Sequence, residues 1–308
     1  MKKISIVLLF LLIATHVCFG QNKQQATAGD YFHAYETQVA TGDDEKAINY
    51  LKRCDEMTLC SPLSSTALGI MYLLGRGVET RDSSDVIIAF LTAVNYDYVN
   101  SSDNKLNDED FIRHIAELGN QNPNDAVARH KNRMENGLTQ YERHMKLDDG
   151  KTKVLQAFCY RWLACSDMVS LDEAVAKDDL EGKLLAASEG LENAMMADSL
   201  NSDAYSEYMI GKMYYEGSLG MRNRKLGIQY FEQSASKGCI SALTYLGEIK
   251  DKNGEKTAAR ELWLQASKQT VIPMVPLTKS NIDYLVSPNI DLYDTKSMQL
   301  KALDYLKK

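Results

Sequence analysis

A spaced pattern of glycine and tyrosine constrains the fold of this chain more than any other feature of its sequence. An aliphatic residue precedes a glycine, a tyrosine follows three positions later, and a second glycine follows six positions later. The two full copies contain Gly69, Tyr72 and Gly75, and Gly211, Tyr214 and Gly217. A third copy begins at Gly247, 36 residues after Gly211, with Lys250 in place of the tyrosine. A spacing of this length is typical of repeated helix pairs.

A second pattern recurs where the partner helix of each pair is expected. A small or aliphatic residue is followed four positions later by a bulky one, and three positions after that by a small one. These offsets place all three on one helical face, where small residues let a neighbouring helix approach and the bulky one fills the space between. The copies are Ala47, Leu51 and Cys54; Val86, Phe90 and Ala93; Ala187, Leu191 and Ala194; Gly227, Phe231 and Ser234; and Ala259, Trp263 and Ala266. Such units bury their apolar faces only by stacking.

These residues resemble two related families of helical repeats. The glycine–tyrosine pattern is similar to the first helix of a Sel-1-like repeat, and the small–bulky–small pattern is similar to the second helix of a tetratricopeptide repeat. The resemblance implies an all-α fold, an α-solenoid of antiparallel helix pairs. It also implies a non-catalytic adaptor of the bacterial cell envelope that binds a protein or peptide through the concave face of the array.

Helix breakers and the quality of the repeats divide the chain. We predict a signal peptide over 1–20, N-terminal repeats over 29–99, degenerate repeats or an inserted helical hairpin over 100–200, C-terminal Sel-1-like repeats over 201–270 and a proline-interrupted tail over 271–308. Loops are expected at 120–124 and 148–150, and a helix over 151–163. Asp294 is placed to cap a last short helix. Two roles stay open for the tail: covering the end of the solenoid, which is the commoner use, or docking on a partner.

The first twenty residues have the organisation of a secretory signal. Lys2 and Lys3 precede an apolar run of about eleven residues, which is shorter than the ~20 that a membrane-spanning helix needs. Small residues at Cys18 and Gly20 predict cleavage before Gln21, and therefore a periplasmic or secreted protein. An uncleaved anchor and a lipoprotein modified at Cys18 are alternatives, although Val17 is not the small residue that usually precedes a lipidated cysteine. No later stretch is apolar enough to span a membrane.

Five cysteines follow the predicted cleavage site: Cys54, Cys60, Cys159, Cys165 and Cys239. Because their number is odd, at least one is free or pairs between chains. Cys54 occupies the small position of a second helix, so we expect it to be buried. Cys60 lies one loop later, within reach of a disulfide with Cys54 if the turn allows it. Cys159 and Cys165 point to different faces of one helix, which disfavours a bond between them.

The charge and the motifs exclude several classes of function. The net charge is −7, and −9 without Lys2 and Lys3, and no basic stripe is present, so nucleic-acid binding is not expected. The sequence contains no Cys-x-x-Cys, no His-Glu-x-x-His and no glycine-rich phosphate loop, so we predict no catalytic residue, no metal site and no cofactor. Paired acids near helix starts favour the helix dipole. An enzyme acting on cell-envelope polymers and a structural subunit of an outer-membrane assembly are the alternative functions.

A concentration of tyrosines marks one candidate partner-binding patch. Beside the core stripe of the helix around Gly211 lie Tyr205, Tyr208, Lys212 and Tyr215, which fall within about 80° of one another on a helix. The equivalent positions in the other copies are Leu63, Thr66, Ile70 and Leu73, and Ser241, Thr244, Glu248 and Asp251. Tyrosine is frequent at binding hot spots because it buries a rigid ring and keeps a hydroxyl for hydrogen bonding. Exposed and contiguous rings would form a docking patch, whereas buried rings would belong to the core.

Overall fold

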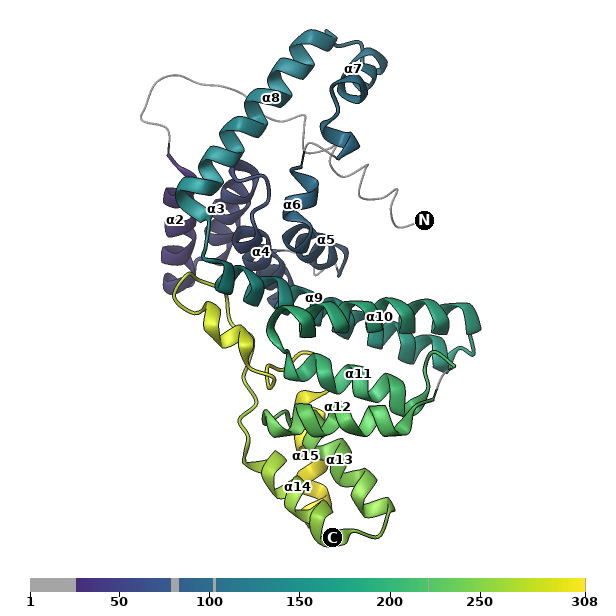
Figure 1. Cartoon of the computed structure of the whole chain (residues 1–308). Helices are drawn as coiled ribbons and strands as arrows, with labels where there is room; N and C mark the ends of the chain where they lie inside the picture. Colours follow the sequence, from purple (N-terminus) through teal and green to yellow (C-terminus); the bar gives the residue numbers. More distant parts are fainter. Residues whose placement is uncertain (1–25, 79–82, 102–103, 221, 308) are drawn as a thin grey trace.

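A computed structural model describes residues 26–78, 83–101, 104–220 and 222–307. Within these ranges the chain forms helices and no strand, and consecutive helices pack as antiparallel pairs in an elongated stack (Figure 1). The predicted all-α solenoid is therefore confirmed. The predicted signal peptide and its cleavage site lie outside the described residues.

Five helix pairs build the stack. They are α2 (Ala28–Thr41) with α3 (Asp44–Met57), α4 (Pro62–Leu74) with α5 (Ser83–Val94), α9 (Asp149–Ala176) with α10 (Leu180–Asn201), α11 (Ala204–Glu216) with α12 (Arg224–Ser236), and α13 (Ile240–Lys252) with α14 (Lys256–Lys268). Gly75 and Gly217 end α4 and α11 in the left-handed conformation, with φ of 65° and 81°. The second glycine of the sequence pattern is thus a helix stop, a position where a side chain would be strained.

The first glycine of the pattern is a point of close helix contact. A Cβ atom on Gly69 would lie 2.5 Å from the ring of Phe90, and one on Gly211 would lie 2.8 Å from the ring of Phe231. Gly247 faces Trp263 in the same way. In each of these three pairs, therefore, the bulky residue of the second helix packs on the glycine of the first, which explains why the two patterns occur together.

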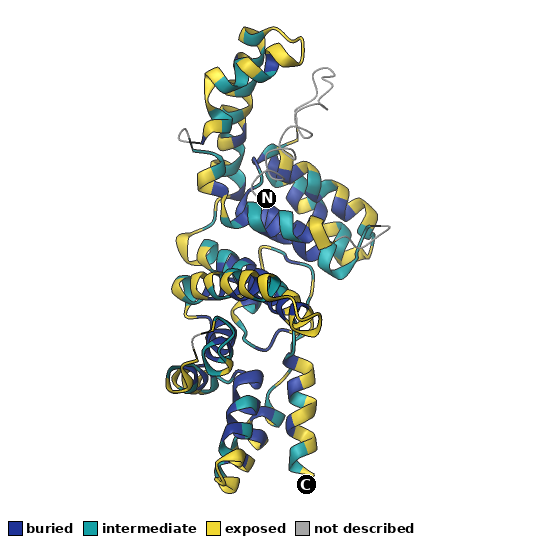
Figure 2. Cartoon of the chain, turned by 90° about the vertical axis from the view of Figure 1, so that its right-hand side faces the viewer, coloured by how far each residue is buried: buried dark blue, intermediate teal, exposed yellow. Residues whose placement is uncertain are grey.

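Between the second and third pairs the chain makes an excursion. After α6 (Tyr96–Val99) and η1 (Lys105–Asn107), α7 (Glu109–Leu118) and α8 (Pro123–Gln140) form a hairpin that projects from the stack, and the turn η2 (Tyr141–Met145) leads into α9. The hairpin carries few buried residues (Figure 2). Its outer end is anchored only within itself, since α7 packs on α8.

Two predicted loops in this region are shorter than expected, because a helix begins inside each of them. The side chain of Asn122 accepts hydrogen bonds from the N–H groups of Asn124 and Asp125, so α8 begins at Pro123. The side chain of Asp148 accepts from Lys151 N, so α9 begins at Asp149 and continues well beyond 163. Asparagine and aspartate are favoured both in turns and at helix N-caps, and here the caps prevail.

The apolar core is nearly continuous along the stack. One cluster joins the first two pairs to α9, and a second joins α9 to α13, so that α9 belongs to both. A smaller third cluster links α13, α14 and the last helix, α15 (Thr295–Leu306). The small–bulky–small residues predicted for the second helices are buried, apart from Leu191, which is half-buried.

The tail runs back along the stack before it ends. After α14 the chain rises to α2 and α9, forms η3 (Ile282–Val286), and returns to place α15 against α13 and α14 (Figure 1). The two ends of the rising part, which extends from Ile272 to Ile290, meet where Ile272 N donates to Asn289 O at 2.8 Å and Asp291 N donates to Ile272 O at 3.0 Å. Asp294 precedes α15 as expected, but its side chain makes no capping hydrogen bond.

Candidate protein-binding face

The tail covers one face of the stack, formed by α9, α11 and α13, which we call the tail-binding face. The predicted patch lies on it but is not an open surface. Tyr205 and Tyr208 are each 1% exposed, and Lys212 and Tyr215 are half-buried. Of the two outcomes open from the sequence, the rings of Tyr205 and Tyr208 follow the buried one, and the chain's own tail contacts both.

The hydroxyl groups of this stripe hold a carboxylate. Tyr205 and Ser241 donate to Oδ1 of Asp294, each at 2.7 Å, and Tyr208 donates to Oδ2 at 2.6 Å. Burial raises the pKa of Tyr205 and of Tyr208 well above the usual value for a phenol, so both remain donors at neutral pH. Hydrogen bonds to an ionised acceptor are shorter and stronger than neutral ones. This is why Asp294 is not free to cap α15.

The stripe of α13 that corresponds to the tyrosine stripe of α11 contacts the last part of the tail, residue by residue along the helix. Ser241, Thr244 and Glu248 are spaced as one helical face, and so are the tail residues that they meet. Thr244 Oγ1 donates to Met298 O at 3.2 Å, and Lys301 Nζ lies 2.6 Å from Glu248 Oε1. Two helix faces therefore meet along at least two turns, with polar contacts at both ends.

The remaining members of the predicted patch contribute less to the contact with the tail. Lys212 Nζ lies 5.5 Å from the ring centroid of Tyr293, whose hydroxyl donates to Asp172 of α9. The ring of Tyr215 packs 6.0 Å from Phe231 and 5.9 Å from Tyr245, between centroids. Lys212 thus lies at the rim of the tail-binding face, whereas Tyr215 is part of the packing between repeats.

Towards the N-terminal pairs, Arg161 of α9 holds the tail by its backbone. This fully buried guanidinium pairs with Asp203 at 3.0 Å and donates to Leu285 O at 2.6 Å and to Ser287 O at 3.0 Å. Tyr35 of α2 donates to Leu277 O at 2.7 Å. Arg161 was not among the residues predicted from the sequence. The feature of the sequence that could have indicated its role is a charged residue inside the apolar stretch of a predicted helix.

The rising part of the tail is also anchored by apolar side chains. Leu277, Ile282, Leu285 and Ile290 are all 1% exposed or less, and all join the core cluster of the first two helix pairs. Leu63, Thr66 and Ile70, which correspond in the first copy to the tyrosine stripe, are buried as well, and Leu73 is half-buried. They lie in the region where α9 packs on α4.

All five cysteines of the described residues are free, so no Cys54–Cys60 disulfide forms. Cys54 is buried as predicted, with Sγ 3.7 Å from Met145 Sδ. Burial raises the pKa of Cys54, and raises that of Cys159 and Cys239 to about 12. These groups are thiols rather than thiolates at neutral pH, which makes them packing residues and poor nucleophiles.

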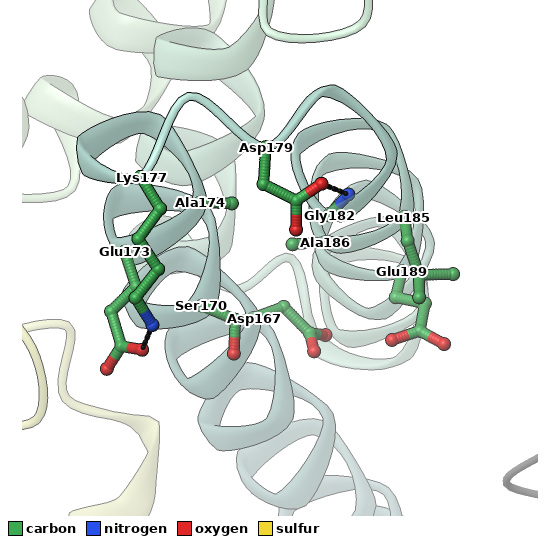
Figure 3. A pocket seen from close by; sticks show the side chains of 10 residues that line it. All are labelled: Asp167, Ser170, Glu173, Ala174, Lys177, Asp179, Gly182, Leu185, Ala186 and Glu189. Atoms are coloured by element: carbon green, nitrogen blue, oxygen red, sulfur yellow. Dashed lines mark hydrogen bonds and ion pairs between the residues drawn. The ribbon is translucent and has the colours of Figure 1, made fainter.

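A shallow pocket of about 220 Å³ lies between α9 and α10, near the turn that joins them (Figure 3). Its charged groups already have partners. Lys177 Nζ lies 3.2 Å from Glu173, and Asp179 accepts a hydrogen bond from Gly182 N at 3.0 Å. Within the described ranges, no group of three His, Cys, Asp or Glu side chains is placed to hold a metal ion, and no helix is long and apolar enough to cross a membrane.

No protein-family profile matches this chain, and no curated protein matches it. Among solved structures, the chain is similar to a Sel1 repeat protein from Oxalobacter formigenes, with 18% sequence identity and a TM-score of 0.33. The alignment covers 78% of this chain and 86% of that one.

Proposed function

We propose that this protein is a non-catalytic scaffold or adaptor that binds a protein or peptide through the concave face of its helix pairs, and that this face is the tail-binding face. The observation that carries the proposal is the way the face holds a polypeptide segment. It contacts backbone carbonyls, a carboxylate and aliphatic side chains, which are the groups that any protein segment offers. Recognition of an extended or helical segment by such a surface is a recurring mode of peptide binding.

The chemistry of the face favours recognition over catalysis. Arg161, Tyr205 and Tyr208 are buried and engaged with tail oxygens, so they act as hydrogen-bond donors of fixed direction. The buried thiols, whose pKa values are raised, have the character of core residues. These features support an adaptor more than an enzyme acting on envelope polymers.

We place this adaptor in an exported compartment, periplasmic or extracellular, on the strength of the signal-like sequence over 1–20. N-terminal sequencing of the mature protein is expected to start at Gln21. A mature chain that starts at a lipidated Cys18 would replace this proposal with a membrane-tethered form of the same scaffold.

Site-specific photo-crosslinking in the native cell tests the binding role. A photoreactive side chain at Lys212, at the rim of the tail-binding face, should capture a protein partner. The matched position is Gln229, which is exposed on α12, the second helix of the same pair. Capture at Lys212 and not at Gln229 supports the proposal. Capture at Gln229 alone, or at neither position, contradicts it.

A further inference from the structure

The last helix of the chain is held more like a bound ligand than like part of the core. Only Thr295, Met298 and Ala302 of α15 are buried, while Leu300 and Leu303 remain 55% and 38% exposed. Beneath it lie α13 and α14, which pack on each other as a pair, and next to them α11, which holds Asp294 just ahead of α15 and pairs with α12. Each of these three helices therefore has a packing partner other than α15.

The polar groups on this part of the face define what can lie there. Tyr205, Tyr208 and Ser241 converge on one carboxylate, that of Asp294, and all three are buried. Without a carboxylate these hydroxyls would lose their acceptor in a site closed to most solvent, and an unsatisfied buried donor is costly. Two oxygens that together accept three hydrogen bonds are what a carboxylate supplies, so the geometry favours an acidic group in any replacement for the tail.

Two further contacts fix the register of a helix that follows this acidic group. Glu248 pairs with Lys301, seven positions after Asp294, so a cation is favoured there. Trp263 stacks on Tyr305, eleven positions after Asp294, with ring centroids 4.4 Å apart and an angle of 24°. Ala302 is fully buried between them, which requires a small residue. Asp294, Lys301, Ala302 and Tyr305 are spaced so that they lie on one face of a helix.

We infer that the face formed by α11, α13 and α14 is a receptor for an amphipathic partner helix that begins with an acidic residue, and that α15 is its built-in occupant. This inference rests on the proposed scaffold function and names its ligand. The partner carries the carboxylate, cation and aromatic ring at the spacing of Asp294, Lys301 and Tyr305, and it binds by displacing α15. Because α15 is tethered beside the site at a high effective concentration, the free receptor is rare until a partner competes or the tail is weakened.

The test uses the full chain and a fluorescent synthetic peptide of residues 291–307. Asp294→Asn in the chain weakens the tethered helix and leaves the receptor surface unchanged. We expect this variant to bind the peptide at least tenfold more tightly than the unmodified chain, since a charge-assisted hydrogen-bond site is lost only in the tethered competitor. The matched control is Asp291→Asn, the same change three residues earlier on an exposed carboxylate that accepts from Lys296 N. It should bind the peptide as weakly as the unmodified chain.

Substitutions at two contact positions of the peptide test whether its binding is specific. A peptide carrying Asp294→Asn should lose about tenfold or more of its affinity for the opened chain. A peptide carrying Lys301→Glu should bind poorly, and should recover when the chain carries Glu248→Lys in addition to Asp294→Asn. Circular dichroism and melting temperature confirm that each variant is folded. If Asp294→Asn unfolds the chain, Lys301→Glu in the chain opens the same site from the other end.

Equal peptide binding by the unmodified chain and the Asp294→Asn chain would overturn the inference, as would equal binding of the two peptides that differ at position 294. These outcomes are separate from the crosslinking result at Lys212. If Lys212 captures a partner but the peptides bind equally well to both chains, the proposed scaffold function stands and the proposed ligand is wrong. If the peptides bind with the expected specificity but no partner is captured, the receptor site stands and the proposed scaffold function is wrong.

Discussion

The tail contacts the two halves of the stack by different chemistry. Its rising part, from Ile272 to Ile290, buries four aliphatic side chains against the N-terminal pairs and gives its backbone oxygens to Arg161 and Tyr35. Its last part, from Tyr293 onward, contacts the C-terminal pairs through a carboxylate, an ion pair and three buried side chains of α15. The first part has the character of structural core, and the second that of an exchangeable ligand.

The largest effect is expected from the anchor of the rising part. Arg161→Met leaves Asp203 buried without its cation and leaves two tail carbonyls without a donor, which should lower the free energy of unfolding by about 3–5 kcal/mol. Urea denaturation measures this value. Arg53→Met is the matched control, because Arg53 forms an exposed i,i+3 pair with Glu56 and should cost at most about 0.5 kcal/mol. Equal, small losses in the two variants would mean that Arg161 does not anchor the tail.

A pair of truncations compares the two parts directly. Leu285→Ala removes a side chain that is 1% exposed and should cost about 3 kcal/mol, whereas Met298→Ala, at 8% exposure on α15, should cost less than about 2 kcal/mol. Hydrogen exchange sharpens the difference. Met298→Ala should raise exchange in α15 alone, whereas Leu285→Ala should raise it across residues 272–290 and in α9. Loss of protection throughout the tail in both variants would show that the two parts unfold as one unit.

The repeats themselves should respond alike in both halves. Gly69→Ala and Gly211→Ala each force a Cβ atom into the facing phenylalanine ring, and each should destabilise by about 1–3 kcal/mol despite the better helix propensity of alanine. Gly211→Leu should cost several kcal/mol. Thermal unfolding measures both changes. An unchanged melting temperature for Gly211→Leu would mean that α11 and α12 do not pack as described.

Most of the helix pairs could be predicted because their determinants are local. Gly69, Gly211 and Gly247 and the bulky residues that pack on them lie within one repeat, at spacings that a helix converts directly into contacts. The stripe of Tyr205 and Tyr208 was located by the same argument. What fills the stripe could not be found in this way, since the hydrogen bonds of Asp294 reach 89 and 86 residues back along the chain.

The same reason explains why the role of Arg161 was missed. Its partners Leu285 and Ser287 are 124 and 126 residues away, and they take part through backbone oxygens that any residue carries. A sequence pattern contains no trace of such a contact. Once the structure shows that the cation of Arg161 is buried, however, an acceptor is expected nearby, because an unpaired buried charge is costly.

The last expected effect is a pH dependence that arises in the N-terminal half, where a second carboxylate is also held by hydroxyls. Asp55 accepts hydrogen bonds from Ser64 at 2.6 Å and from Ser65 at 2.8 Å. Burial nevertheless raises its pKa to about 6, because the desolvation of the charged form outweighs the hydrogen bonds that stabilise it.

In the unfolded chain this carboxyl has a pKa near 3.8, so between pH 4 and pH 6 the folded chain binds more protons than the unfolded one. The free energy of unfolding therefore falls as the pH rises through this window, at roughly 1 kcal/mol per pH unit at most. Asp55→Asn cannot titrate and should lose this slope, while the contributions of the other groups, including His130, cancel in the difference between the two chains. Urea denaturation at pH 4, 5, 6 and 7 measures the difference. If the difference in unfolding free energy between the two chains stays constant over this range, water reaches Asp55. The hydroxyls of Ser64 and Ser65 would then surround a solvated carboxylate, unlike the hydroxyls around Asp294.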